Sequence, residues 1–318
     1  MNDDNDAPNV LSWNPRGLND PDRRTTVHNT IASSSCHIVC LQETKLAHVD
    51  QFTAAFLGGH RLKNFAQRPA EGTRGGILLL WDDDLFHLHD FQIGIFSLSA
   101  MVSSRKSGAT FKLTGVYGPT VAGLKDAFFA ELIALKPPPG TRWLALGDFN
   151  QIHRARDKNN SNINRSRLRR FRSALQTCEL SDIHLQNRRF TWSNERATPT
   201  LSKLDGFFCN EEWDVFFSDH ILHALSSSLS DHCPLLLACD RGAPQDLGAL
   251  NLRTFGSSSL VSNRLLRRLG LPLRLMLSHA MPSSTKWCTL ERPFVDGANR
   301  SSRGTSYNCK WPRKSSYG

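Results

Sequence analysis

The sequence predicts an α/β protein in which a two-layer core of β-sheet is flanked by helices. Seven short apolar runs typical of strands outnumber three stretches with helical spacing. Many of these runs are apolar at every position, as expected for a sheet that another layer covers. The regular pattern ends near Asp240. We therefore expect one folded domain over residues 8–240.

The predicted elements follow one another along this domain. Strands are expected at residues 10–13, 37–41, 76–81, 111–117, 142–146, 203–209 and 234–238. Helices are expected at residues 25–32, 125–135 and 166–178. The second helix must end at the three prolines 137–139, because proline cannot continue a helix. Trp13, Trp81 and Trp143 lie inside apolar runs and are expected in the core.

The charge is divided unevenly between this domain and the residues after it. The chain of 318 residues has 39 Lys and Arg against 29 Asp and Glu, a net charge of +10. Residues 241–318 contain 13 of the cations and 3 of the anions, which leaves 26 of each in residues 1–240. The net charge is therefore no argument that the domain binds nucleic acid.

The composition after residue 240 also differs from that of the domain. Arg, Leu and Ser make up 34 of these 78 residues, against 68 of the first 240. These amino acids have the largest codon families, so their excess is what a shifted reading frame or intron read-through would give. We expect residues 241–318 to be a basic, disordered tail without a role in catalysis.

The sequence also indicates a compartment. The N-terminus lacks the apolar stretch of a secretory signal, and no apolar run approaches the length of a membrane span. Eight cysteines are too few for a disulfide scaffold. We expect a protein of a reducing compartment, the cytosol or the nucleus, without membrane association.

Polar residues follow several predicted strands at the point where each ends. Asn14, Glu43 and Asp148 stand after apolar runs, and Asp205 and His232 lie within or just before others. Taken singly, each has an ordinary explanation: residues 147–150 would suit a turn, Glu43 an exposed strand end, and His232 a cap. Taken together, carboxylates, amides and an imidazole at strand ends form the inventory for metal-assisted hydrolysis of a phosphate ester.

That chemistry gives each residue type a task. Mg²⁺ prefers hard oxygen ligands and keeps several waters, which suits Glu43. Asp148 can hold the attacking water, and Asp205 can keep His232 oriented and cationic. Donors for the phosphate oxygens would be Asn14, Asn150, Tyr117 and the protonated His232.

Seven motifs occur in a fixed order, at residues 12–19, 41–45, 115–119, 147–150, 189–194, 203–205 and 230–235. In this order they resemble the endonuclease/exonuclease/phosphatase superfamily. The resemblance covers residues 8–240. More narrowly, the chain is similar to the endonuclease domain of plant LINE-type non-LTR retrotransposons, because Arg-Arg-Phe-Thr-Trp-Ser-Asn at residues 188–194 is typical of that branch.

The resemblance implies a pancreatic-deoxyribonuclease-like fold, a four-layer α/β/β/α sandwich of two mixed sheets flanked by helices. It implies Mg²⁺, or Mn²⁺ in its place, bound by Glu43 with Asn14 and Asp231 close to the ion. Asp148 would activate or orient the water, Asn150 would hold the phosphate, and Tyr117 would assist the phosphate or the leaving group. Asp205 would orient His232, which stabilises the transition state, while Thr191 and Ser230 would support substrate contacts. Gly206 departs from the pattern, since related retroelement sequences usually have Arg or another polar residue there.

The activity implied is a DNA-nicking endonuclease that leaves a 3′-hydroxyl, acting as a nuclear monomer on DNA without a protein partner. A repair endonuclease for abasic sites, or a phosphatase, is an alternative on the same fold. A catalytically decayed fragment that binds nucleic acid is an alternative of another class.

A basic segment directly after Asn150 bears on the choice. Residues 154–172 contain eight cations, Arg154 and Arg156 among them, against Asp157 alone. The segment could be a solvated helix face, or it could bind the DNA backbone beside the site.

Overall fold

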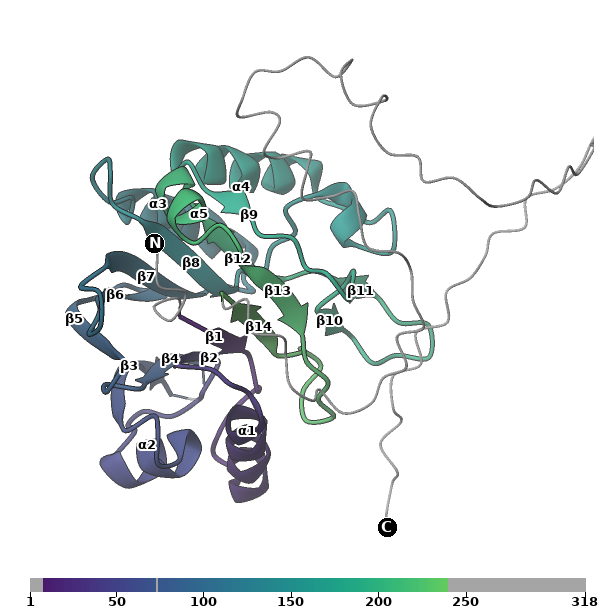
Figure 1. Ribbon diagram of the computed structural model, residues 1–318. Coiled ribbons are helices and arrows are strands. Elements are labelled where there is room, and N and C mark those ends of the chain that lie inside the picture. The colour runs from purple at the N-terminus through teal and green to yellow at the C-terminus, as the bar shows by residue number, and fades with distance from the viewer. Residues whose placement is uncertain (1–7, 73, 240–318) are drawn as a thin grey trace, which may run out of the picture. The chain divides into compact units, whose positions relative to one another are not determined.

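The computed structural model describes residues 8–72 and 74–239, which form two six-stranded mixed sheets (Figure 1). The first sheet has the order β13-β14-β1-β2-β4-β3 and the second has the order β5-β6-β7-β8-β12-β9. The strands of the first sheet are β13 (Ile221–Ala224), β14 (Leu235–Ala238), β1 (Val10–Trp13), β2 (Ile38–Gln42), β4 (Arg74–Trp81) and β3 (Asn64–Glu71). The strands of the second are β5 (Phe86–Ile93), β6 (Ser97–Ser104), β7 (Thr110–Tyr117), β8 (Trp143–Asp148), β12 (Asp205–Cys209) and β9 (Ser181–Asp182).

Helices α1 (Pro21–Ser33), α2 (Gln51–Gly58), α3 (Lys125–Ala134) and α4 (Arg165–Thr177) cover the outer faces of the two sheets. The short helix α5 (Glu211–Phe216) instead contributes Trp213 to the core between the sheets, and short 3₁₀ turns lie at Ala122–Leu124 and Ala155–Asp157. Helices α1 and α2 lie on one side of the paired sheets, and α3 and α4 on the other (Figure 1). A small hairpin of β10 (Trp192–Ser193) and β11 (Leu201–Ser202) stands apart from both sheets.

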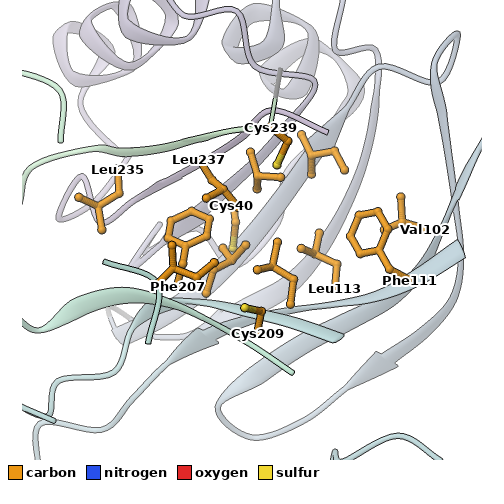
Figure 2. Close-up of a cluster of buried hydrophobic side chains, with 14 of the residues drawn as sticks. Cys40, Val102, Phe111, Leu113, Phe207, Cys209, Leu235, Leu237 and Cys239 are labelled. Atoms are coloured by element: carbon orange, nitrogen blue, oxygen red, sulfur yellow. The ribbon is translucent and has the colours of Figure 1, made fainter. Parts of the chain in front are cut away.

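Two cores lie on opposite faces of the same strands, which explains why the runs are apolar at every position. In β2, Ile38 and Cys40 join the core between the sheets, whereas Val39 and Leu41 pack with α1 and α2. In β8, Leu144 faces the inner core and Trp143 packs under α3 and α4. Successive side chains of a strand point to opposite faces, so a strand between two packed layers must be apolar on both. Figure 2 shows the inner core, with Cys40 and Leu237 of the first sheet near Leu113 and Phe207 of the second.

Helix starts follow local sequence rules. Helix α1 begins after Asp20, whose side chain accepts a hydrogen bond from the Asp22 amide, and Pro21 occupies the first turn. Helix α4 begins after Asn164, whose side-chain oxygen accepts from the Arg167 amide at 2.9 Å. Local sequence therefore sets the residue at which each of these two helices begins.

The predicted fold class is confirmed: two mixed sheets packed face to face are flanked by helices. All seven predicted strands and three predicted helices are present, with bounds that differ by a few residues at their ends. Sequence analysis missed the strands β3, β5, β6 and β13, the two-residue strands β9, β10 and β11, and the helices α2 and α5. Four of the missed strands, β3, β5, β9 and β13, lie at sheet edges, where strands alternate or are largely exposed, and α2 presents Phe52 to solvent with 86% of its surface exposed. Trp13, Trp81 and Trp143 are buried as predicted.

Within the part of the chain that the structure describes, no helix combines the length and apolarity needed to cross a membrane. The predicted tail, residues 241–318, lies outside the described residues.

Candidate active site

The polar residues predicted at strand ends meet at one edge of the paired sheets. Parallel strands β1 and β2 end there at Trp13 and Gln42, directly before Asn14 and Glu43. Parallel strands β7 and β8 end at the same edge with Tyr117 paired to Asp148. Strand β12 is antiparallel to β8, so it begins there, and its first residue, Asp205, pairs with Asp148. The gathering follows from strand direction: parallel strands end where antiparallel strands begin.

His232 is held by a chain of buried hydrogen bonds. Its Nδ1 lies 2.9 and 3.0 Å from the two carboxylate oxygens of Asp205. The Thr191 hydroxyl donates to Asp205 Oδ2 at 2.6 Å and accepts from the amides of Leu204 and Asp205 at 3.0 and 3.1 Å. All three side chains are buried. The imidazole is therefore fixed, with Nε2 directed at Asp148 Oδ2, 3.8 Å away.

Asn14 connects the two sheets at the site. Its amide nitrogen donates to Glu43 Oε2 at 3.1 Å and to Asp148 Oδ2 at 3.0 Å. Its amide oxygen accepts from the Arg16 backbone amide at 2.9 Å. Asn14 thus presents its nitrogen to the carboxylates. The predicted contact between Asn14 and a metal ion would require its oxygen to face them instead.

Glu43 is the most accessible carboxylate of the central group. It is half-buried and receives hydrogen bonds from Tyr117 Oη at 2.9 Å and from Asn14, and its other oxygen lies 3.0 Å from Lys45 Nζ. Burial opposes ionisation, but Lys45 and the two hydrogen bonds hold the pKa of Glu43 below its usual value. Glu43 is therefore a charged oxygen donor that faces solvent.

Asp148 and Asn150 lie on either side of Phe149, whose ring is buried in the outer core. The Asn150 amide donates to Asp148 Oδ1 at 2.8 Å, and its side chain donates to Asp148 Oδ2 at 3.1 Å and to the Gly118 carbonyl at 2.9 Å. Lys125, a buried residue that sequence analysis did not single out for the site, donates to the Asn150 carbonyl at 2.7 Å. Gly147 and Asp148 are the last residues of β8, so the motif is a strand end at the site and not a turn.

The buried carboxyl and imidazole groups have shifted pKa values. Complete burial, followed by repulsion from Asp205, raises the pKa of Asp148, although His232 and Asn14 act in the opposite direction. Burial alone would lower the pKa of His232, but the neighbouring carboxylates Asp205 and Asp148 overcome this and raise it. Burial and the charges of Glu43 and Asp148 raise the pKa of Tyr117, which keeps its hydroxyl a hydrogen-bond donor. The site therefore combines a carboxyl whose pKa is raised toward neutrality with a cationic imidazole.

Asp231 has partners that sequence analysis did not anticipate. Its Oδ2 lies 2.6 Å from Arg16 Nη1 and accepts from Trp192 Nε1 at 2.9 Å, and Ser230 Oγ lies 3.4 Å from its Oδ1. Ser230 itself donates to the Asn14 carbonyl at 2.8 Å, so it ties the loop before β14 to the loop after β1. Thr191 and Ser230, predicted to contact substrate, both hold other site residues in place.

Backbone strain is concentrated around this edge. Among the described residues, seven other than glycine have positive φ, and four of them belong to the site: Arg16 (58°), Glu43 (50°), Lys45 (57°) and Asn150 (49°). A left-handed conformation costs an L-residue about 1–2 kcal/mol. The surrounding hydrogen bonds offset this cost at four positions of one site. Such a concentration of strained residues is typical of functional sites.

At this sheet edge, a divalent metal ion has two possible positions. Glu43 offers a charged, partly exposed carboxylate, which fits Mg²⁺. Potential ligand atoms of Asp148, Asp205 and His232 also lie within 4.8 Å of one another. In that trio, however, His232 Nδ1 is bonded to Asp205 and the pKa of His232 is raised, whereas a metal ligand must be a neutral imidazole. The donor chemistry therefore favours Glu43.

The basic segment lies beside the site and is partly neutralised. Arg154 Nη1 lies 3.4 Å from Asp182, a buried carboxylate that also pairs with Lys203 at 2.7 Å. Arg156 is exposed, and its carbonyl accepts two hydrogen bonds from Arg189 in the segment that leads to Thr191. On α4, the exposed cations are Arg165, Arg169, Arg170 and Arg172, of which Arg170 pairs with Asp126. Arg156 and α4 thus provide exposed positive charge, whereas Arg154 shares the carboxylate of Asp182 with Lys203.

Four residues of the site went unnoticed in the sequence: Arg16, Lys45, Lys125 and Trp192. Arg16, Lys45 and Trp192 lie inside the motifs at residues 12–19, 41–45 and 189–194, and this is the signal that could have found them. Lys125 begins a helix outside these motifs, so only the fold brings it to this edge.

Comparisons with known proteins identify the family. The model of the endonuclease/exonuclease/phosphatase family matches residues 9–232. A search of curated proteins found no match.

Solved structures share the fold at low sequence identity. The AP endonuclease LMAP from Leishmania major is 16% identical, with a TM-score of 0.57 over 72% of this chain and 86% of that one. The catalytic domain of APE2 from Xenopus laevis is 16% identical, with a TM-score of 0.54 over 72% and 91%. The endonuclease domain of TRAS1, a telomere-specific non-LTR retrotransposon, is 15% identical, with a TM-score of 0.53 over 73% and 97%. At these identities the likeness establishes the fold.

Proposed function

The chain belongs to the endonuclease/exonuclease/phosphatase family of phosphate ester hydrolases, and we propose that it is a divalent-metal-dependent endonuclease that nicks DNA and leaves a 3′-hydroxyl. The observation that carries the proposal is the convergence of charged oxygen donors, a raised-pKa carboxyl and a cationic imidazole at one sheet edge beside exposed arginines. The motif at residues 188–194 supports a retrotransposon origin, as does the fold shared with the TRAS1 domain.

Each residue has a defined task in this proposal. A divalent cation bound at Glu43, Mg²⁺ or Mn²⁺, supplies Lewis-acid stabilisation of the phosphate oxygens. Asp148 orients the attacking water and accepts its proton, since a carboxyl with a raised pKa is a better base near neutral pH. His232, cationic and fixed by Asp205, donates from Nε2 to the negative charge that develops on the phosphate. Tyr117 Oη and the Asn150 side chain are further donors at the same edge.

DNA as the substrate also accounts for the surroundings of the site. Arg156 and the exposed arginines of α4 are available for phosphate contacts, which position a duplex without reading its sequence. Because the proposed substrate is DNA, the proposed place of action is the nucleus. In this proposal the chain acts as a monomer without a protein partner.

A plasmid assay tests the proposal. Supercoiled plasmid is incubated with the full chain and Mg²⁺, beside Glu43→Ala and His232→Ala. We expect nicked circles with the unaltered chain, losses of at least roughly 100-fold in both variants, and nicks that a DNA polymerase can extend. Nicking that persists in both variants, or its absence throughout, would contradict the proposal.

Two further substrates separate the alternatives within the family. Cleavage confined to duplexes with an abasic site would indicate a repair endonuclease. Phosphate release from inositol phosphates without nicking would indicate a phosphatase. DNA binding without any hydrolysis would identify a catalytically decayed chain.

A further inference from the structure

Arg16 is placed at the site by its own backbone. It follows β1 by three residues, has φ of 58°, and its amide donates to the Asn14 side-chain oxygen at 2.9 Å. A residue with a long side chain rarely adopts this backbone conformation, so Arg16 is strained. The surrounding contacts hold it in place despite the strain. Its side chain is 51% exposed, which leaves much of the guanidinium in contact with solvent at the edge of the site.

One end of this guanidinium is attached to a buried carboxylate. Arg16 Nη1 lies 2.6 Å from Asp231 Oδ2, and Trp192 Nε1 donates to the same oxygen at 2.9 Å. Asp231 is only 7% exposed and follows Ser230, which is bonded to the loop of Asn14. Two donors thus occupy Oδ2, and the charge of Asp231 is matched by that of Arg16.

Hydrogen bonds place Arg16 next to the catalytic group. Its amide is bonded to Asn14, whose side chain donates to Glu43 at 3.1 Å and to Asp148 at 3.0 Å. Its partner Asp231 directly precedes His232, and Trp192, which shares Asp231 Oδ2, forms an isolated β-bridge with His232. Arg16 therefore lies at the edge of the site.

We propose that Arg16 binds a phosphate oxygen of the substrate in the active site, and that Asp231 anchors Arg16 instead of serving as a metal ligand. The geometry supports both parts. A guanidinium has five donors, of which Asp231 engages one nitrogen, so the exposed donors remain for a phosphate diester. A metal ion bound at Asp231 Oδ2 would have to displace both Arg16 and Trp192 from that oxygen.

The proposal rests on the proposed function for the identity of the substrate, a phosphate diester. The electrostatic pairing of Arg16 with Asp231 does not depend on that function. If Asp231 were a metal ligand, its removal would weaken metal binding. If it anchors Arg16, its removal frees a cation and leaves the metal at Glu43. These two cases differ in metal binding alone, without any DNA.

The experiment measures Mn²⁺ binding by electron paramagnetic resonance, and plasmid nicking, on the full chain. The variants are Arg16→Ala, Arg16→Lys and Asp231→Asn, with Glu43→Ala as the reference for a lost ligand. Arg105→Ala is the matched control, because Arg105 also pairs with an aspartate, Asp83, at 2.7 Å. Arg105 lies in the turn between β6 and β7, at the opposite end of β7 from Tyr117. Arg16→Lys keeps the charge, and circular dichroism checks that each variant is folded.

We expect Arg16→Ala to lower kcat/KM for nicking about 10- to 100-fold, the loss typical of one charged hydrogen bond. We also expect it to tighten Mn²⁺ binding several-fold, because a cation has been removed. Arg16→Lys should recover part of the nicking with Mn²⁺ binding unchanged. Asp231→Asn leaves Arg16 without its anion, so it should weaken Mn²⁺ binding only several-fold, far less than Glu43→Ala. Arg105→Ala should behave as the unaltered chain in both assays.

Two results would overturn the proposal. Asp231→Asn that loses Mn²⁺ affinity as strongly as Glu43→Ala would make Asp231 a metal ligand. Arg16→Ala that nicks as fast as the unaltered chain would remove Arg16 from substrate binding. A chain that binds Mn²⁺ but never nicks would contradict the proposed function. The Mn²⁺ measurements would then still decide the role of Asp231.

Discussion

Thr191 is the residue whose removal tests most directly how the site is held together. Its buried hydroxyl donates to Asp205 at 2.6 Å and accepts from two backbone amides at 3.0 and 3.1 Å. Thr191→Val keeps the shape of the side chain and deletes all three hydrogen bonds. Thr191→Ser keeps the hydroxyl and deletes one methyl group, so it is the matched control.

The magnitude follows from these contacts. Loss of a charge-assisted hydrogen bond costs about 1.5–3 kcal/mol, and amides left without an acceptor add to this. We expect Thr191→Val to lower the free energy of unfolding by about 2–4 kcal/mol, whereas Thr191→Ser should lower it by only about 1 kcal/mol, the transfer free energy of a methyl group. Because Asp205 then loses its fixed orientation, nicking by Thr191→Val should also fall, by up to about 100-fold.

Urea unfolding of the full chain, followed by tryptophan fluorescence, measures the first effect, and plasmid nicking measures the second. The two effects must occur together, since both arise from Asp205. Equal stability of the Val and Ser variants, to within about 0.5 kcal/mol, would refute the assignment of the hydroxyl to this network. A destabilised Val variant that nicks normally would refute the link from Thr191 through Asp205 to His232.

Three further predictions concern metal, pH and salt. Glu43→Gln, which keeps the side-chain shape, should lose Mn²⁺ binding and lower kcat by at least roughly 100-fold, as measured by paramagnetic resonance and plasmid nicking. His232 has a pKa that is raised in the folded chain, so its contribution to stability is fully present below the unfolded pKa of about 6.5 and is lost as the pH rises through the folded value. The stability advantage of the unaltered chain over His232→Gln should therefore shrink from pH 6 to pH 10, and an advantage that grows with pH would contradict this. Replacing the exposed Arg156 or Arg169 by Ala should reduce the slope of log K for DNA against log salt by about 1 each if they contact phosphates. Arg154→Ala should reduce that slope by less, because the Arg154 side chain is directed to Asp182.

The sequence by itself determined the elements and the types of residue in the site. Strands apolar at every position, such as Val39–Leu41 within β2, predicted sheets buried on both faces, and the structure has a core on each face. The strand-end residues Glu43, Asp148, Asp205 and His232 were identified because polar groups directly after apolar runs are local features of the sequence. Edge strands such as β3 and β5, and helix α2, were missed because they pack on one face only. Their sequences therefore lack the continuous apolar runs by which the other strands were predicted.

Only the tertiary structure decided which of these residues meet and what each one contacts. Strand direction brings Asn14 and His232, 218 positions apart, to one edge. The same packing pairs Asp231 with the guanidinium of Arg16, and Asp182 with that of Arg154. Contacts across such distances depend on the register of strands and on which charges the fold leaves buried together. The sequence therefore shows the inventory of the site, and the fold determines which members of that inventory bind a metal, a phosphate or each other.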